Sequence, residues 1–204
     1  LTTGPAVERF ERGLAEFTGT RFCSVLNSGT AGLHAAYFAA GLGPGDEIVT
    51  TPLTFSATAN AALMLGARVH FADVDPRTGL ISPSSVEEKI TSKTRFIVPV
   101  DYSGHPADYS PLGELAEANS IRIVAGACHS LGATYREKKV GTLADISVFS
   151  FHPAKAVTTG EGGGVVTDCE NMNQMVRNFR NHGLITDPQG FERNEGPWHQ
   201  TPHV

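Results

Sequence analysis

The sequence predicts an α/β fold in which helices cover both faces of a largely parallel sheet. Short runs rich in β-branched residues alternate with segments of helical periodicity, which is the pattern of a parallel α/β domain. The runs at 96–98 and 146–151 are continuously apolar, as expected for strands covered on both faces. With 204 residues, 40% of them hydrophobic, the chain is long and apolar enough for one domain with a substantial core.

The elements follow one another in regular alternation. In the first expected helix, Val7, Phe10, Leu14 and Phe17 fall at helical spacing, and Pro5 suits a first helical turn. The expected helices span residues 5–18, 30–40, 57–65, 84–90, 111–118 and 170–182. The expected strands span residues 22–26, 47–51, 68–72, 95–100, 121–125, 146–151 and 164–167.

Composition excludes several classes of function. The formal net charge is −5 and no basic run is present, which argues against nucleic acid or a membrane surface as a partner. No apolar stretch approaches the length of a membrane span, and no signal-peptide pattern opens the chain. Cys23, Cys128 and Cys169 are odd in number and lack CxxC spacing. We therefore expect reduced thiols, a cytoplasmic location, and neither a disulfide nor a metal site.

Lys155 is the first candidate for chemistry. An apolar run from Phe149 leads into this lysine, and a glycine-rich segment, residues 158–164, follows. Ligands of parallel sheets bind beyond the carboxyl ends of the strands, where this lysine falls. A partly dry site disfavours an ammonium ion, so the amine is a candidate nucleophile for an aldehyde cofactor. A solvated loop lysine is the alternative interpretation.

Three further segments complete a possible ligand site. Gly29 and Thr30 follow a strand and open a helix, where free N–H groups favour an anion, although a simple helix cap has the same pattern. Ser150, at a strand end, is a second candidate phosphate ligand or a turn serine. Phe55 is a candidate stacking partner for a flat ring or an ordinary core residue. Anchored phosphate, covered ring and captured aldehyde are the requirements of pyridoxal 5'-phosphate.

The amino-acid sequences of these segments resemble those of one known family. The chain is similar to the DegT/DnrJ/EryC1/StrS sugar aminotransferases, pyridoxal-phosphate enzymes of fold type I that act on nucleotide-linked keto-sugars. The segments FHPAK and TTGEGG most resemble the branch that aminates a UDP-linked 4-keto-6-deoxy-N-acetylhexosamine in pseudaminic acid biosynthesis. The matching stretches are residues 1–5, 27–34, 43–47, 51–60, 104–108, 129–133, 150–155 and 159–163.

The resemblance implies a domain plan and partners. Residues 1–185 correspond to the large cofactor-binding domain, and residues 186–204 to the start of a region that leads to a small C-terminal domain. Without an initiator Met, the chain is expected to be a fragment. The family also implies a homodimer with a shared active site, an amino-acid donor that is commonly glutamate, and a nucleotide-linked keto-sugar as acceptor.

The resemblance also implies a role for each candidate residue. Lys155 is expected to bind the cofactor covalently and then to move a proton between cofactor and sugar. Gly29, Thr30 and Ser150 are expected to hold the phosphate, with Phe55 over the ring. His129 is expected near the ring face or its 3′ oxygen.

One position departs from the family pattern. Where the family usually has Glu-Asp-Ala-x-His, with the Asp bonded to the pyridine nitrogen, residues 125–129 read AGACH, so Gly126 stands at the Asp position. Three interpretations remain open: a substitution or error in an active lineage, a degenerate copy that binds cofactor but transfers amines poorly, or a site with water or another group at the nitrogen.

Two competing functions follow. The first is a catalytically impaired cofactor-binding or scaffold homologue, motivated by Gly126. The second is another reaction on the same fold, such as desulfuration or an aldol cleavage. No Cys is obviously placed for desulfuration, and the extensive resemblance to the sugar aminotransferases disfavours this alternative.

The remaining polar residues receive no role. Arg177 and Arg180 lie one helical turn apart, and a solvated helix face is the expected explanation. Asp101, Tyr102 and His105 follow a strand, and contact with sugar or cofactor stays open.

Overall fold

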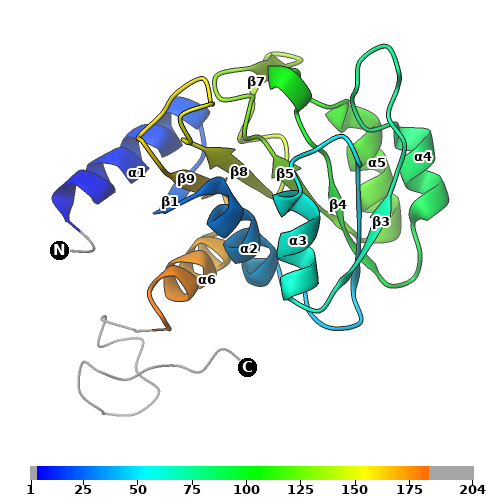
Figure 1. The fold of residues 1–204 in the computed structure, drawn as a ribbon, viewed down its shortest axis with the longest axis horizontal. Helices are drawn as coiled ribbons and strands as arrows, with labels where there is room; N and C mark the ends of the chain where they lie inside the picture. The colour runs from blue at the N-terminus through cyan, green and yellow to red at the C-terminus, as the bar shows by residue number, and fades with distance from the viewer. Residues whose placement is uncertain (1–3, 184–204) are drawn as a thin grey trace.

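The computed structural model describes residues 4–183, which form three layers with a twisted sheet in the middle (Figure 1). The helices are α1 (Pro5–Thr18), α2 (Gly29–Ala39), α3 (Ala57–Met64), α4 (Pro83–Lys89), α5 (Tyr109–Asn119) and α6 (Glu170–Arg180), with a 3-10 turn η1 (Tyr102–Gly104). The strands are β1 (Phe22–Leu26), β2 (Glu47–Thr50), β3 (Arg68–Phe71), β4 (Thr94–Val98), β5 (Arg122–Gly126), β6 (Thr134–Tyr135), β7 (Lys138–Lys139), β8 (Ile146–Ser150) and β9 (Gly163–Thr167).

The large sheet is mostly parallel. Its strand order is β1-β9-β8-β5-β4-β2-β3, and β3, β2, β4, β5 and β8 pair in parallel. Only β9 runs against its neighbours, since it pairs antiparallel with both β1 and β8. β1 therefore points the same way as the parallel strands. The carboxyl ends of β1, β2, β4, β5 and β8 consequently lie at one edge of the sheet.

The predicted helices and strands are present, with ends that differ by a few residues. The fold class is confirmed. The short β6–β7 hairpin was not predicted, because its polar residues show no strand periodicity. Its turn residues Arg136 and Glu137 have φ values of 46° and 67°, a geometry that alternation of apolar residues does not signal. The segment 186–204 lies outside the described residues.

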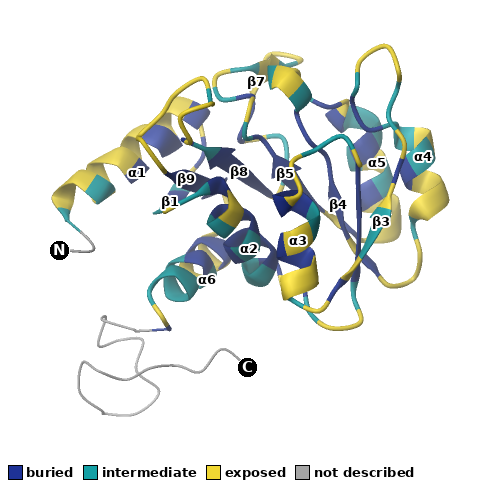
Figure 2. Ribbon diagram, in the orientation of Figure 1, coloured by how far each residue is buried: buried dark blue, intermediate teal, exposed yellow. Residues whose placement is uncertain are grey.

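Two apolar layers cover the sheet, one on each face (Figure 2). Leu33 and Ala36 of α2 and Ala61 of α3 pack with Phe96 and Val148 on one face, where α6 also lies. On the opposite face, α4 and α5 cover the β4 and β5 side of the sheet, and α1 covers the β8 and β9 side. The strands β2, β8 and β9 are buried at nearly every position, because helices cover both faces of the sheet, as predicted.

Close glycine contacts fix α2 against the sheet edge. A Cβ on Gly29 would lie 2.9 Å from Cβ of Ser150, and one on Gly32 would lie 2.8 Å from Cγ1 of Val148. A Cβ on Gly163 would overlap the carbonyl oxygen of Ser28 at 2.1 Å. Glycine at these three positions lets the start of α2 lie close to the ends of β8 and β9. Larger residues would prevent this close approach.

The expectation of a solvated arginine face on α6 was wrong. Arg177 and Arg180 donate to the carboxylate of Glu11 in α1, at 2.9 and 2.5 Å. The Glu11 side chain is only 4% exposed, and it also accepts from the N–H of Val25. The two arginines thus join the first and last helices of the described chain through a buried carboxylate. Two arginines one helical turn apart have the same spacing on a solvated helix face and in a buried ion pair. Only their partner in α1 therefore distinguishes the two interpretations.

None of the described helices has the length and apolar character that crossing a bilayer requires. Cys23, Cys128 and Cys169 are free thiols, and the described residues include no group of His, Cys, Asp and Glu side chains placed to hold a metal ion.

Candidate active site

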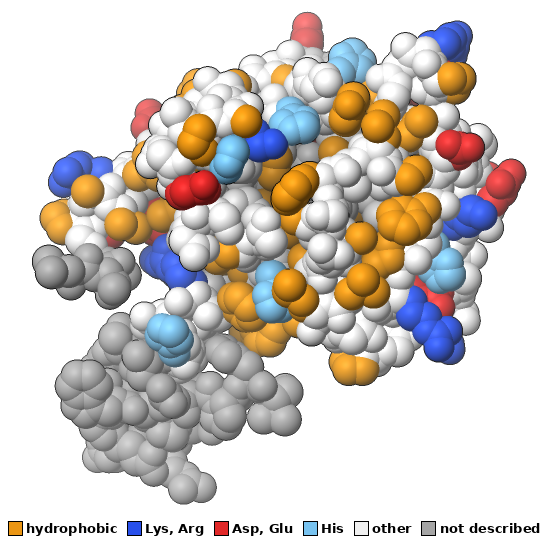
Figure 3. Space-filling view, in the orientation of Figure 1, with side chains coloured by type: hydrophobic (Ala, Val, Ile, Leu, Met, Phe, Trp, Pro, Cys, Tyr) orange, Lys and Arg blue, Asp and Glu red, His pale blue; other side chains and the backbone are white. Residues whose placement is uncertain are grey.

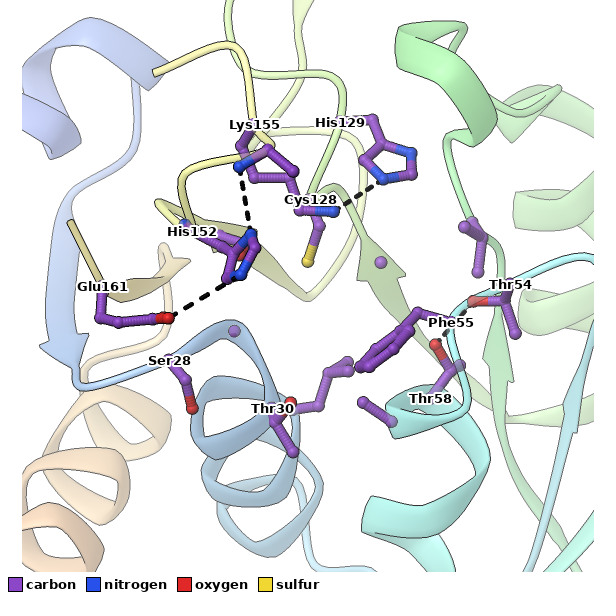
Figure 4. Close-up of a pocket in the computed structure, with 17 residues that line it drawn as sticks. Ser28, Thr30, Thr54, Phe55, Thr58, Cys128, His129, His152, Lys155 and Glu161 are labelled. Atoms are coloured by element: carbon purple, nitrogen blue, oxygen red, sulfur yellow. Dashed lines mark hydrogen bonds and ion pairs between the residues drawn. The ribbon is translucent and has the colours of Figure 1, made fainter. Parts of the chain in front are cut away.

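A cavity of about 440 Å³ opens at the carboxyl edge of the sheet, above the start of α2. Lysine and histidine side chains gather there beside hydrophobic ones on the face shown in Figure 3. The structure brings all the sequence-predicted site residues together around this cavity (Figure 4). They are Gly29, Thr30, Phe55, Gly126, His129, Ser150 and Lys155.

One wall is built from the start of α2 and the end of β8. Ser28 precedes the helix in extended conformation, and its Oγ accepts a hydrogen bond from the N–H of Ala31 at 3.1 Å. Gly29 is buried against Ser150, while the hydroxyl of Thr30 lies at the exposed start of the helix. N–H groups of a first helical turn have no partners within their own helix and carry a partial positive charge. Together with the hydroxyls of Thr30 and Ser150, these N–H groups form a cradle for an anion.

Lys155 and His129 meet on the opposite wall. Nζ of Lys155 lies 2.8 Å from Nε2 of His129, although 26 residues separate them in sequence. Partial burial, and then the positive charge of Lys155, lower the pKa of His129 below its ordinary value. The imidazole is therefore neutral near pH 7, and Nε2 accepts from the lysine when the ring proton is on Nδ1. The pair holds the amine of Lys155 over the cavity.

Phe55 lies on the loop before α3 and is not a core residue. Its side chain is 74% exposed, so packing of the domain does not explain its position. Close by, the hydroxyls of Thr54 and Thr58 bond to each other at 2.8 Å and fix the loop to the first turn of α3. An exposed aromatic ring at the rim of a cavity is suited to cover a flat ligand.

The part of the cavity formed by Gly126 carries no charge. Gly126 ends β5, and a Cβ there would lie 3.3 Å from Cγ2 of Val100. Among the described residues that line the cavity, the one carboxylate is that of Glu161, which faces His152 (3.8 Å) on the glycine-rich loop. Asp101 follows β4 near Gly126, but its side chain is fully buried and bonded to other residues.

Among the residues of the cavity wall that were not predicted, Cys128, His152 and Glu161 carry ionisable groups. Cys128 lies beside Gly29, and burial raises the pKa of its thiol to about 11. Such a thiol is an inert wall residue and not a nucleophile for desulfuration. Glu161 pairs with His152, whose Nδ1 accepts from the N–H of Ala154. His152 thus shapes the loop that carries Lys155. The only signal of these contacts in the sequence is the high density of polar residues at positions 150–163.

This arrangement fits pyridoxal phosphate at three of its four contact regions. The glycine at position 29 leaves room that a Cβ would fill, the helix start and Ser150 suit a phosphate, and Lys155 suits an aldehyde. Phe55 suits the ring face. At Gly126 no side chain is available to bond the ring nitrogen.

The comparisons with known proteins point the same way. Residues 1–196 match the DegT/DnrJ/EryC1/StrS aminotransferase family. Over 189 residues the chain is 43% identical to UDP-4-amino-4,6-dideoxy-N-acetyl-beta-L-altrosamine transaminase of Campylobacter jejuni, covering 91% of this chain and 50% of that protein.

Solved structures agree with this match. Helicobacter pylori PseC, an aminotransferase involved in the biosynthesis of pseudoaminic acid, superposes with a TM-score of 0.88 at 36% identity, over 98% of this chain and 54% of that one. Bacillus subtilis NtdA with bound cofactor PMP superposes with a TM-score of 0.85 at 34% identity, over 89% of this chain and 41% of that one. The chain spans about half the length of these relatives.

Proposed function

Because the chain belongs to the DegT/DnrJ/EryC1/StrS aminotransferase family, we propose that it transfers an amino group from an amino acid to a nucleotide-linked 4-keto-6-deoxy sugar. Glutamate is the donor to test first. The resemblance to the altrosamine transaminase and to PseC supports a UDP-linked N-acetylhexosamine of the pseudaminic acid type as acceptor. The observation that carries the proposal is the amine of Lys155 held over a cavity whose far wall is an anion cradle.

Each residue around the cavity then has a chemical task. Bound pyridoxal phosphate carries the amino group and withdraws electrons from the carbon at which a proton is exchanged. Lys155 would hold the cofactor aldehyde, and its free Nζ would accept and return that proton. Neutral His129 accepts a hydrogen bond from Nζ and so keeps the amine directed into the cavity.

The walls position the ligand and limit water. Ser28, Thr30 and Ser150 line the same part of the cavity and would surround the phosphate, and Gly29 would let the helix backbone approach it. Phe55 excludes water from one face of the ring. By analogy with the family, the protein forms a homodimer in which a second copy of the chain completes the site. It acts in the cytoplasm.

Gly126 favours a second candidate function, a homologue that binds the cofactor without efficient turnover. A carboxylate beside the pyridine nitrogen keeps it protonated, and protonation strengthens the electron-withdrawing effect of the ring. Gly126 has no side chain for this task, and Asp101 is already bonded to three donors. Water or another group at the nitrogen is the third possibility.

The test uses the full-length protein in wild-type, Lys155→Ala and Gly126→Asp forms. Borohydride reduction after loading with pyridoxal phosphate, followed by peptide mapping, is expected to place the cofactor on Lys155 in the first and third forms. Cofactor found on another lysine contradicts the assignment of the site.

Turnover is measured next with glutamate and a UDP-linked 4-keto-6-deoxy sugar, by mass spectrometry of the aminated sugar. Activity in Gly126→Asp with little in wild type identifies Gly126 as a disabling residue. Equal activity in both forms shows that the pyridine nitrogen has another partner. Gly126→Asn is the matched control, because the side chain of Asn has nearly the shape of Asp without its charge.

A further inference from the structure

Asp101 is a buried carboxylate that the proposed reaction does not use. Its side chain is fully buried at the start of the loop after β4. The carboxylate accepts from the N–H of Ala107 at 3.0 Å, the hydroxyl of Tyr109 at 2.9 Å and the hydroxyl of Ser130 at 2.6 Å. Burial raises the pKa of Asp101, while these three donors oppose that change. A desolvated carboxylate with its oxygens occupied by neutral donors makes strong, geometrically defined contacts.

The shortest of these bonds reaches the active-site wall. Ser130 is 1% exposed and directly follows His129, the residue that bonds Lys155. The N–H of Asp101 also donates to the carbonyl oxygen of Gly126 at 3.2 Å. Side chain and backbone of Asp101 therefore bond both ends of the segment 126–130.

The loop that follows Asp101 lies against the same segment. A Cβ on Gly104 would lie 3.1 Å from the carbonyl oxygen of His129, so the two backbones are nearly in contact there. The ring of Tyr102 approaches the imidazole of His129 edge-on, with 6.4 Å between the ring centroids. His129 thus has little freedom on its backbone side, and its imidazole projects toward Lys155 (Figure 4).

We propose that Asp101 is a positioning residue, which locks the segment carrying His129 through Ser130 and thereby holds the imidazole in hydrogen-bonding distance of Lys155. Asp101 has no place in the cavity wall itself and acts only through these neighbours. The inference deepens the proposed function, because it relies on Lys155 being the reactive amine. The contact between His129 and Lys155 is nevertheless measurable in the protein without cofactor.

The experiment is an NMR titration of the histidine ring protons in the cofactor-free, full-length protein, with the His129 signal assigned by a His129→Gln variant. Lys155, on the segment between β8 and β9, is the charged group that faces His129, and His105 is the one that acts on Asp101 from its own loop. In wild type the pKa of His129 is expected below its ordinary value. In Asp101→Asn and in Ser130→Ala it is expected to rise toward that value, because the imidazole then becomes less buried and moves away from Lys155.

Tyr109→Phe is the matched control. It removes one donor of the same carboxylate, at 2.9 Å, but leaves the bond to Ser130 in place. It is expected to lower thermal stability to an extent comparable with Ser130→Ala while leaving the titration of His129 unchanged. A purely structural role of Asp101 predicts instead that stability falls in all variants while the pKa of His129 stays constant in each of them.

A double-mutant cycle completes the test. In a Lys155→Met background the ammonium is absent and only the loss of burial can still raise the pKa of His129, so Ser130→Ala is expected to change that pKa less than in wild type. If Asp101→Asn does not fold, Ser130→Ala decides the question alone. An unchanged His129 titration in folded Ser130→Ala overturns the proposal. A protein that lacks aminotransferase activity but shows the expected titrations leaves this inference intact and refutes only the proposed function.

Discussion

Replacing Gly29 with alanine tests the construction of the anion cradle. The added Cβ would lie 2.9 Å from Cβ of Ser150, 3.2 Å from its Oγ and 3.4 Å from Sγ of Cys128. Carbon atoms in contact are usually separated by about 3.5–4.0 Å, so the start of α2 must move by roughly 1 Å. Overpacking of this kind costs about 1–3 kcal/mol. The higher helix propensity of alanine returns at most about 1 kcal/mol, so we expect net destabilisation.

Two measurements follow this substitution in the full-length protein. Urea unfolding without cofactor reports the stability change, and titration with pyridoxal phosphate reports its affinity. Since the N–H groups of the first turn move together with the helix start, affinity is expected to fall about tenfold, which corresponds to about 1.4 kcal/mol.

Two other glycines supply the controls. At Gly113, inside α5, an added Cβ meets no atom within 4 Å, so Gly113→Ala is expected to stabilise the protein by about 0.5–1 kcal/mol. At Gly32 the added Cβ would lie 2.8 Å from Val148, deeper in the core, so Gly32→Ala should destabilise without a comparable loss of affinity. If Gly29→Ala behaves like Gly113→Ala in both measurements, the close approach of α2 to Ser150 has no role in ligand binding.

Further predictions concern three other features. Glu11→Ala should lower the free energy of unfolding by about 3 kcal/mol, as measured by urea unfolding. This is the lower end of the range for breaking a buried ion pair, because the side chain of Arg177 is 40% exposed. Arg12→Ala is the control and should have no effect. Phe55→Ala should change stability by less than about 0.5 kcal/mol but weaken cofactor binding by about 0.5–1.5 kcal/mol, measured by the same titration; an equal loss of both would make Phe55 a structural residue. Cys128, with a pKa of about 11, should react with iodoacetamide slowly at pH 7 and faster as pH rises, since only the thiolate reacts; peptide mapping that finds it modified as fast as exposed Cys169 would contradict the buried wall.

The sequence predicted the α/β fold because its strands are apolar runs and its helices are periodic. The segments around Gly29, Phe55, Ser150 and Lys155 were recognisable because each follows a strand whose carboxyl end points to the same edge. Their meeting around one cavity is a consequence of the sheet order. Local patterns therefore sufficed to nominate residues, while their distances depended on the tertiary structure.

Contacts between distant segments were beyond local patterns. Nothing in the spacing of Arg177 and Arg180 reveals that Glu11 is buried between them. The bond between Asp101 and Ser130 likewise joins loops that follow different strands. A polar residue at a strand end has the same local sequence whether it faces a ligand or is buried beneath the site, so such residues remained without a role until the structure placed them.

The reversed strand β9 also determines when the site is complete during synthesis of the chain. β9 lies between β1 and β8, so the segment that ends in the anion cradle and the segment that leads to Lys155 are joined only after β9 has paired with both. The β1–β9 pairing joins Phe22 to Thr167, and pairings of such large sequence separation form late, because a long loop must be closed before they yield any contact. We therefore expect the two walls of the candidate site to come together only after the chain as far as Thr167 has been synthesised.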